Sequence, residues 1–189
     1  MTLAGKSLFV TGGNSGIGLA TALRFAREGA DIAILSRRSD LNEQAKAQVE
    51  ALGVKCLTIA GDVTRETDVK AAIDATVAAF GGIDFAFNCA GLNQSVTPLE
   101  AVTLEEFSAQ MDVNARGTFL SMKYQIPVMR ARGGGAFGNL CGLRLGWRPI
   151  SIAPGSQRAS GFHKLPLSQC QHLGPGHPCI DHPARDPED

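Results

Sequence analysis

The chain has 189 residues, of which 44% are hydrophobic and 19% are charged, so it can bury one substantial core as a soluble domain. Its 18 basic and 18 acidic residues cancel to a net charge of zero, which argues against a nucleic-acid or anionic-membrane partner. No apolar stretch is long enough to cross a bilayer, no secretion signal is visible and the five cysteines are an odd number, so we expect a cytoplasmic protein without a disulfide framework.

Apolar runs typical of strands alternate with helical patterns through the first half of the chain. We predict strands at 7–11, 31–35, 55–60 and 83–88, separated by helices that end near 29 and span about 40–52 and 66–80. Two expected helix starts carry a capping-box pattern, at Asp40/Glu43 and at Thr103/Glu106. This order predicts an α/β fold, a Rossmann-type doubly wound parallel sheet, in which the loops that begin the helices share the carboxyl edge.

A glycine-rich loop joins the first expected strand to the first helix. Gly12 lets the chain turn tightly, while Gly16 and Gly18 open a helix whose unpaired N–H groups favour an anion. With Ser15 and Ile17 between them, these residues predict a phosphate cradle, for which a plain glycine turn is the alternative. The spacing Thr-Gly-x3-Gly-x-Gly resembles the cofactor loop of the short-chain dehydrogenase/reductase family, which implies a nicotinamide dinucleotide as cofactor.

The second and third expected strands end in polar residues that should lie on the same edge as the glycine loop. No acid stands in Ser36-Arg37-Arg38 to bind both ribose hydroxyls of NAD, and Arg37 can pair with a 2′-phosphate, so we expect NADP, with NAD as the alternative. Arg37 could equally be a solvated surface residue. Asp62, followed by Val63, could accept a hydrogen bond from an adenine amino group or cap the next helix, a role for which Thr64 is better placed.

The fourth expected strand ends in Asn88-Cys89-Ala90-Gly91, which resembles the Asn-Asn-Ala-Gly segment of the same family. The resemblance implies that Asn88 bridges neighbouring strands, and that Ala90 and Gly91 let the backbone approach the cofactor ribose. A simple strand-to-loop turn is the alternative, because Asn and Gly are common turn residues. We expect the thiols of Cys56 and Cys89 to be buried.

A long helical pattern follows at about 104–132, interrupted by Pro127, which should kink or end it. Asn114 falls on the helix stripe that faces the sheet, so its amide must find partners there, and it could simply bond backbone groups. The segment 111–117 resembles the family segment with the catalytic Asn, which implies a role for Asn114 in proton relay. The family's acid/base pair, Tyr-x3-Lys, has no counterpart at Tyr124, the chain's one tyrosine, because Val128 stands four residues later.

The sequence changes character after about residue 136. Prolines and histidines gather there, periodicity fades after a short apolar run at 136–140, and Cys141 and Gly142 stand where the family has serines. We therefore predict a dinucleotide-binding domain at 1–136, whose sheet is incomplete at its C-terminal edge, and an irregular tail at 137–189. A reading-frame shift near 136–140 is our hypothesis for this change, and low solubility from uncovered apolar surface is its expected consequence.

The family resemblance implies an oxidoreductase that moves hydride between NAD(P)(H) and a small alcohol or carbonyl compound, and relatives that form homo-oligomers through the long helix. Without the Tyr-x3-Lys pair, we expect this chain to be inactive as it stands. A non-catalytic nucleotide-binding module is the alternative. A second, weaker alternative is a zinc-binding tail, although the spacing of its candidate ligands is unusual for zinc; these are Cys170, His172, His177, Cys179 and His182.

Overall fold

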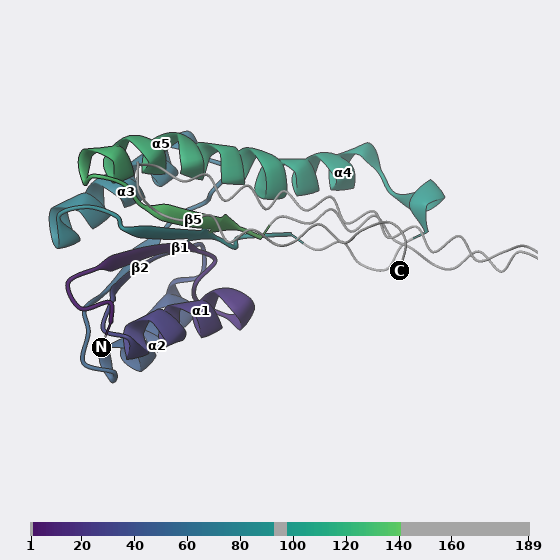
Figure 1. Ribbon diagram of the computed structural model, residues 1–189. Coiled ribbons are helices and arrows are strands. Elements are labelled where there is room, and N and C mark those ends of the chain that lie inside the picture. Colours follow the sequence, from purple (N-terminus) through teal and green to yellow (C-terminus); the bar gives the residue numbers. More distant parts are fainter. Residues whose placement is uncertain (1, 93–97, 141–189) are drawn as a thin grey trace, which may run out of the picture.

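The computed structural model describes residues 2–92 and 98–140, and within them five parallel strands lie between two layers of helices (Figure 1). The strands are β1 (Ser7–Thr11), β2 (Asp31–Ser36), β3 (Cys56–Ala60), β4 (Phe85–Asn88) and β5 (Ala136–Asn139). The helices are α1 (Gly16–Arg27), α2 (Ser39–Glu50), α3 (Glu66–Phe80), α4 (Leu104–Met111) and α5 (Gly117–Ala131), with a 3-10 turn η1 (Leu99–Ala101) and a π-helical turn η2 (Asp112–Arg116). The predicted Rossmann-type sheet is confirmed.

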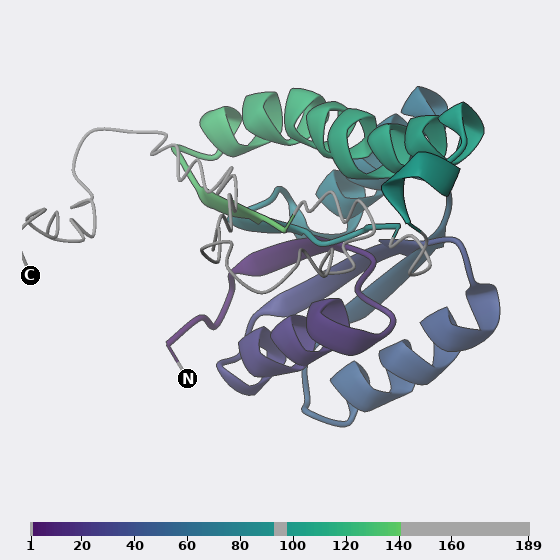
Figure 2. The ribbon, with the colours of Figure 1, turned by 90° about the vertical axis from the view of Figure 1, so that its right-hand side faces the viewer.

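The sheet has the strand order β3-β2-β1-β4-β5, and every neighbouring pair is parallel. Helices α1 and α2 cover one face, and α3, α4 and α5 cover the other, as both views of the ribbon show (Figures 1 and 2). Because both faces are covered, the central strands are buried along their length, from Ile32 to Ser36 in β2 for example. Two apolar clusters result, one centred on Ile32 and Ile34 below the sheet and one on Phe9 and Ile73 above it.

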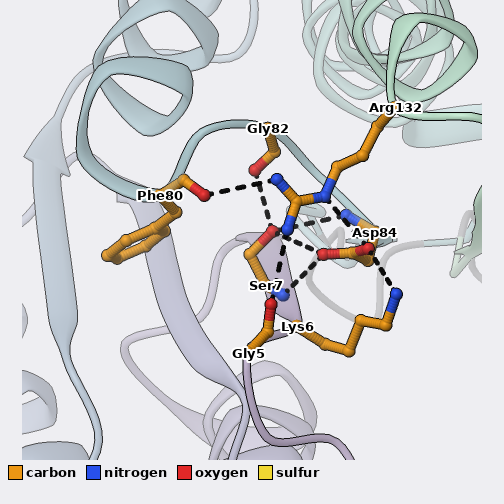
Figure 3. A network of polar contacts seen from close by, with 7 residues as sticks. All are labelled: Gly5, Lys6, Ser7, Phe80, Gly82, Asp84 and Arg132. Atoms are coloured by element: carbon orange, nitrogen blue, oxygen red, sulfur yellow. Dashed lines mark hydrogen bonds and ion pairs between the residues drawn. The ribbon is translucent and has the colours of Figure 1, made fainter.

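The amino edge of the sheet is held by a polar network around Asp84 (Figure 3). The Asp84 carboxylate accepts hydrogen bonds from Ser7 N at 2.9 Å, Lys6 Nζ at 3.1 Å and Arg132 Nε at 3.1 Å. Arg132 also donates to the carbonyl oxygens of Phe80 and Gly5, at 3.4 and 3.3 Å. The network therefore joins β1, the segment before β4 and the ends of α3 and α5, on the edge opposite the glycine loop.

The structure tests three predictions about where helices begin and end. The capping box at Thr103 and Glu106 is confirmed, with both reciprocal hydrogen bonds present. The one at Asp40 is wrong, because α2 already begins at Ser39 and its N-cap residue, Arg38, makes no side-chain cap. Pro127 does not end its helix, since α5 continues to Ala131; the proline lies on the exposed side, where solvent can hydrate the carbonyl group that loses its donor.

The C-terminal edge of the described sheet is β5, which pairs in parallel with β4 from Phe85↔Ala136 to Asn88↔Asn139. This strand confirms the short run expected at 136–140, and within the described residues the sheet ends at β5, as expected for a sheet that is incomplete at this edge. The division into a domain at 1–136 and a tail at 137–189 stays a prediction, because residues 141–189 lie outside the described residues. None of the helices in the described segments is long and apolar enough to cross a membrane.

Candidate functional site

The glycine loop makes two close backbone approaches at the carboxyl end of β1. Gly12 has φ of +69°, and a Cβ atom there would lie 2.9 Å from the Ala90 Cα atom. A Cβ atom on Gly18, in the first turn of α1, would collide with the Gly12 carbonyl oxygen. The hydroxyl of Thr11 accepts hydrogen bonds from the N–H groups of Cys89 and Ala90, both at 3.1 Å. The loop is therefore packed against the end of β4, which fixes the start of α1.

The first turn of α1 carries no side-chain cap. Ser15 is its N-cap residue with extended backbone angles, but its hydroxyl makes no capping hydrogen bond and instead accepts one from Arg38 Nη2 at 3.2 Å. The Ser15 side chain therefore leaves the first N–H groups of α1 uncapped, at a helix end where the dipole also favours an anion. Below the loop, the buried Asn14 Nδ2 donates to Asn42 Oδ1 at 2.9 Å and to the Arg38 carbonyl at 3.3 Å. Sequence reasoning placed Arg38 at the end of the second strand but did not predict its contact with Ser15, and it missed the pairing of Asn14 with Asn42.

A cleft of about 590 Å³ opens over the carboxyl ends of the strands. It brings together most of the residues singled out from the sequence, namely Gly12, Ser15, Ile17, Arg37, Asp62, Val63, Ala90, Gly91 and Asn114. Gly16 and Gly18 begin α1 beside it, and Asn88 is buried at the end of β4, but none of these three lines the cleft. The lining also includes Ser36 and Cys89, which belong to the strand-end segments expected at this edge, and Val113 and Leu140, which were not among the predicted site residues.

One side of the cleft carries Arg37 and Asp62, at the ends of β2 and β3. Burial alone would raise the pKa of Asp62, but a hydrogen bond from Thr64 N at 2.9 Å and the charges of Arg37 and Arg65 lower it overall. Asp62 is therefore a carboxylate at neutral pH. Thr64 does not cap the next helix, whose N-cap residue is Arg65, again without a side-chain cap. Ser36 lies at the end of β2, and its buried hydroxyl has no hydrogen-bond partner among residues 2–92 and 98–140.

The Asn88 side chain joins β4 to β5 and to α5. Its Nδ2 atom donates to Asn139 Oδ1 at 2.9 Å and to Gln125 Oε1 at 3.1 Å, and its Oδ1 atom accepts from Gln125 Nε2 at 2.9 Å. Gln125 is fully buried, so this reciprocal amide pair lies in the core beneath the cleft. Asn88 thus bridges neighbouring strands. Its partners Gln125 and Asn139 carry no distinctive motif, and sequence reasoning missed them.

Asn114 lies in the π-helical turn η2, nearly buried at 3% exposure. Its Oδ1 atom accepts from Leu92 N at 2.8 Å, and its Nδ2 atom donates to the Leu92 carbonyl at 3.1 Å. The amide therefore bonds a backbone segment just after β4, which is the structural alternative stated above, and it does so at the wall of the cleft. The unbroken helical pattern expected at 104–132 did not indicate this π-helical turn.

Tyr124 lies away from the cleft, on the face that α5 turns toward α3. Its hydroxyl donates to Glu66 Oε1 at 2.5 Å, and Lys123 Nζ contacts the same oxygen at 2.6 Å. The hydrogen bond to Glu66 raises the pKa of Tyr124, the opposite of what a phenol acting as a base at neutral pH needs. Its ring packs against the apolar cluster above the sheet.

The two described cysteines differ in burial. Cys56 is buried, and burial, together with the charge of Glu50, raises the pKa of its thiol to about 12. Cys89 is only half-buried at the cleft, so the expectation of a buried thiol holds for Cys56 alone. Within 2–92 and 98–140 no cluster of three or more potential metal ligands occurs, and the candidate zinc ligands of the tail lie outside these residues.

Comparison with known proteins identifies relatives of residues 6–141, which match the family model described as short chain dehydrogenase. The 2,5-dichloro-2,5-cyclohexadiene-1,4-diol dehydrogenase of Sphingobium indicum is 48% identical over 132 residues, which make up 69% of this chain and 51% of that protein. Levodione reductase of Leifsonia aquatica is 39% identical over 132 residues, which make up 69% of this chain and 49% of the reductase.

The solved structures agree with the sequence matches. The crystal structure of NAD+-bound xylitol dehydrogenase has a TM-score of 0.71 and 36% identity, and the match covers 72% of this chain and 53% of that one. The chain thus spans about half the length of the relatives that it matches. The family match extends over the glycine loop, the ends of the strands and the π-helical turn that line the cleft. On these grounds the chain belongs to the short-chain dehydrogenase family, whose members bind nicotinamide dinucleotides.

Proposed function

We propose that the cleft binds a nicotinamide dinucleotide, NADP in preference to NAD, in the manner of an oxidoreductase that transfers hydride between the nicotinamide and a small alcohol or carbonyl compound, and that this chain, which lacks the Tyr-x3-Lys pair, is inactive as it stands. The observation that carries the proposal is the meeting, in one cleft, of the glycine loop at the uncapped start of α1 with Arg37 and Asp62. The residues present fit this cofactor, because helix N–H groups suit a pyrophosphate and a carboxylate suits the amino group of adenine.

In this proposal each strand end contacts one part of the dinucleotide. Ser15, Gly16, Ile17 and Gly18 surround the pyrophosphate, with Gly12 allowing the close approach. Asp62 and Val63 bind the adenine, while Ala90 and Gly91 face the ribose and Asn88 supports them from the core. In such an oxidoreductase Asn114 would take part in proton relay. The bound nicotinamide would supply or accept the hydride.

The preference for NADP rests on charge at the end of β2. A 2′-phosphate carries nearly two negative charges, and the exposed Arg37 can form a charge-assisted hydrogen bond with it, with Arg38 next to it. No acid at 36–38 is present to bind both ribose hydroxyls, as a site selective for NAD would require.

Isothermal titration with NADPH and NADH tests this preference. We expect NADPH to bind the unmodified chain about tenfold more tightly than NADH, and Arg37→Ala to remove most of that difference. Arg65→Ala is the matched control, because Arg65 is equally exposed and also lies near Asp62 but does not line the cleft. Equal affinity for the two cofactors in the unmodified chain would contradict the NADP assignment.

A non-catalytic nucleotide-binding module is the second candidate, and the position of Tyr124 favours it. The chain's one tyrosine is hydrogen-bonded to Glu66 outside the cleft, so no phenol of the described residues can protonate a substrate there. We therefore propose that this chain binds the cofactor without turning it over.

An assay of NADPH consumption separates the two candidates. Cyclohexanone is a suitable probe for consumption of NADPH, and cyclohexanol with NADP+ for the reverse reaction, because a relative named above acts on a diol of a six-membered carbon ring. Binding of NADPH without its consumption is the expected result, and steady turnover that depends on the probe would show that the chain is an active enzyme.

The family resemblance also leads us to propose a homo-oligomer formed through α4 and α5. Both helices lie at the outside of the upper layer (Figure 1) and expose large apolar side chains, with Leu104 at 79%, Phe119 at 63% and Phe107 at 39% exposure. Single exposed apolar side chains are common on protein surfaces, but three on consecutive helices suit a contact between subunits.

A further inference from the structure

We propose that the contact between Gly117 and Val63 sets the width of the dinucleotide cleft, and that Gly117 is a positioning residue for cofactor binding. The inference rests on the proposed function of the cleft, and it gives a role to a residue that does not line the cleft and to which the sequence analysis assigned no role. It follows from the way in which the π-helical turn is held between the ends of two distant strands.

Strands β3 and β4 are not neighbours, because β2 and β1 lie between them. The π-helical turn nevertheless touches the loops that follow both strands. On the β4 side, Asn114 bonds both backbone groups of Leu92. On the β3 side, Gly117, the residue after the turn, packs directly on Val63. One short segment thus spans the carboxyl edge where a dinucleotide would lie.

The contact at Gly117 leaves no room for a side chain. A Cβ atom there would lie 2.7 Å from Val63 Cγ2, 3.1 Å from Val63 Cβ and 3.5 Å from the Val63 carbonyl oxygen. The first distance is well inside van der Waals contact, so a side chain would have to displace either α5 or Val63. Val63 has little freedom to give way, because it is only 7% exposed and its branched side chain is stiff at χ1.

The backbone of Gly117 gives no other reason for a glycine. Its φ and ψ of −61° and −41° are ordinary helical values, at which alanine is the better helix former. Glycine at the start of α5 therefore weakens the helix locally without any conformational need. The close approach to Val63 explains why this position holds a glycine.

The contact matters for the cleft because residues on both sides of it form the lining. Val63 lines the cleft from the end of β3, and Val113 and Asn114 line it from the π-helical turn. A methyl group on Gly117 would separate these residues by about 1 Å, the difference between 2.7 Å and a normal carbon–carbon contact. A bound dinucleotide would then lose contacts on one side.

A double-mutant cycle tests the inference, with NADPH affinity as the readout. We expect Gly117→Ala to weaken NADPH binding about tenfold in the native background, and by less than about threefold when Val63→Ala has already removed the opposing methyl groups. Ala115→Ser is the matched control, because it enlarges an exposed residue of the same turn, and it should change the affinity by less than about twofold. Circular dichroism confirms that each variant is folded before titration.

The outcomes separate this inference from the proposed function. If the unmodified chain binds neither NADPH nor NADH, the proposed function fails, and this inference fails with it. If the unmodified chain binds but Gly117→Ala has no effect, or has the same effect in both backgrounds, only the inference is overturned. If Gly117→Ala alone does not fold, the addition of Val63→Ala should restore folding, and failure to do so would equally overturn the contact as the cause.

Discussion

Asp84 is the residue on whose charge the amino edge of the sheet most depends (Figure 3). Its side chain is only 8% exposed and accepts hydrogen bonds from Ser7, Lys6 and Arg132. Burial alone would raise the pKa of Asp84, but these hydrogen bonds and the Arg132 charge lower it overall. The folded state therefore binds the Asp84 proton more weakly than the unfolded chain does. The stability this group contributes is present above its ordinary pKa and lost as the pH falls through the lowered value.

We predict that Asp84→Asn lowers the free energy of unfolding by about 2 kcal/mol at pH 7, because charged hydrogen bonds are lost. The difference from the unmodified chain should begin to shrink below about pH 4, where the unfolded chain takes up the Asp84 proton, and should shrink further as the pH falls through the lowered pKa of Asp84 in the folded state. Urea unfolding between pH 7 and pH 3 measures both effects. Asp74→Asn, which removes a carboxylate from an exposed ion pair with Lys70, is the control and should change little at any pH. A difference for Asp84→Asn that stays constant over this range would contradict the assigned role of its charge.

Cys89 offers a chemical probe of the cleft, because its thiol lies in the lining and is half-buried. Burial raises the pKa of Cys89, and the backbone N–H of Gly18 offsets this only in part, so alkylation should be slow at pH 7 and faster above pH 9. We predict that NADPH at ten times its dissociation constant slows this alkylation about tenfold. Mass spectrometry of the Cys89 peptide follows the reaction, with Cys56 as the buried internal control. An unchanged rate would place the dinucleotide elsewhere.

Single residues were predictable from the sequence where a local motif identified them. Gly12, Ser15 and Ile17 of the glycine loop and the pairs Asp62-Val63 and Ala90-Gly91 line the cleft, because the end of a strand fixes their position, while their roles in binding stay predictions. Gln125 and Asn139 could not be found in this way, since their only relevance is that folding brings both amides to Asn88. Arg38 was placed beside Arg37 at the end of the second strand. Its hydrogen bond to the Ser15 hydroxyl could not be predicted, because it depends on where α2 begins.

At the scale of elements, the amide pair of Asn88 and Gln125 joins α5 to β4, and the bond to Asn139 extends this link to β5. Gln125 is fully buried, so its loss would leave the Asn88 oxygen without that donor in the core. We predict that Gln125→Leu lowers the free energy of unfolding by about 2 kcal/mol, measured by urea denaturation. Gln48→Leu on the exposed side of α2 is the control and should have little effect. Equal stability of Gln125→Leu and the unmodified chain would show that the amide pair contributes nothing.

The helix between β4 and β5 shows why element boundaries were harder to predict than elements. The periodicity at 104–132 indicated a helix, and its start at Thr103 was readable from the capping box. The π-helical turn at Asp112–Arg116 was not readable, because it depends on Asn114 bonding Leu92 and on Gly117 approaching Val63. Pro127 was expected to interrupt the helix, and packing of α5 against the sheet overrides that local preference.

At the scale of the whole molecule, alternation of apolar runs and helical patterns was enough to predict a doubly wound parallel sheet. The apolar run in β2 is so regular because both faces of the sheet are covered. The strand order β3-β2-β1-β4-β5 places the glycine loop after β1, at the centre of the sheet, which is why the predicted site residues converge. The position of α4 and α5 over that sheet leaves Phe119 exposed.

We predict that Phe119→Glu shifts the proposed oligomer toward monomer, because a charge would be buried at the contact between subunits. Size-exclusion chromatography with light scattering, on the unmodified chain and the variant at equal concentration, measures the change in mass. Gln44→Glu, which adds the same charge at an exposed position on α2, is the control for charge alone. An unmodified chain that is monomeric at high concentration would contradict the proposed interface.

The most direct test of the account is whether a dinucleotide binds at the start of α1. Two-dimensional amide NMR of the labelled chain during titration with NADPH reads this site residue by residue. We predict that the resonances of Ser15, Gly16, Ile17 and Gly18 shift and saturate together, while those of Gly53, in the turn after α2, stay in place. Unmoved resonances for all four residues at saturating NADPH, in a folded sample, would contradict the assignment of the cleft.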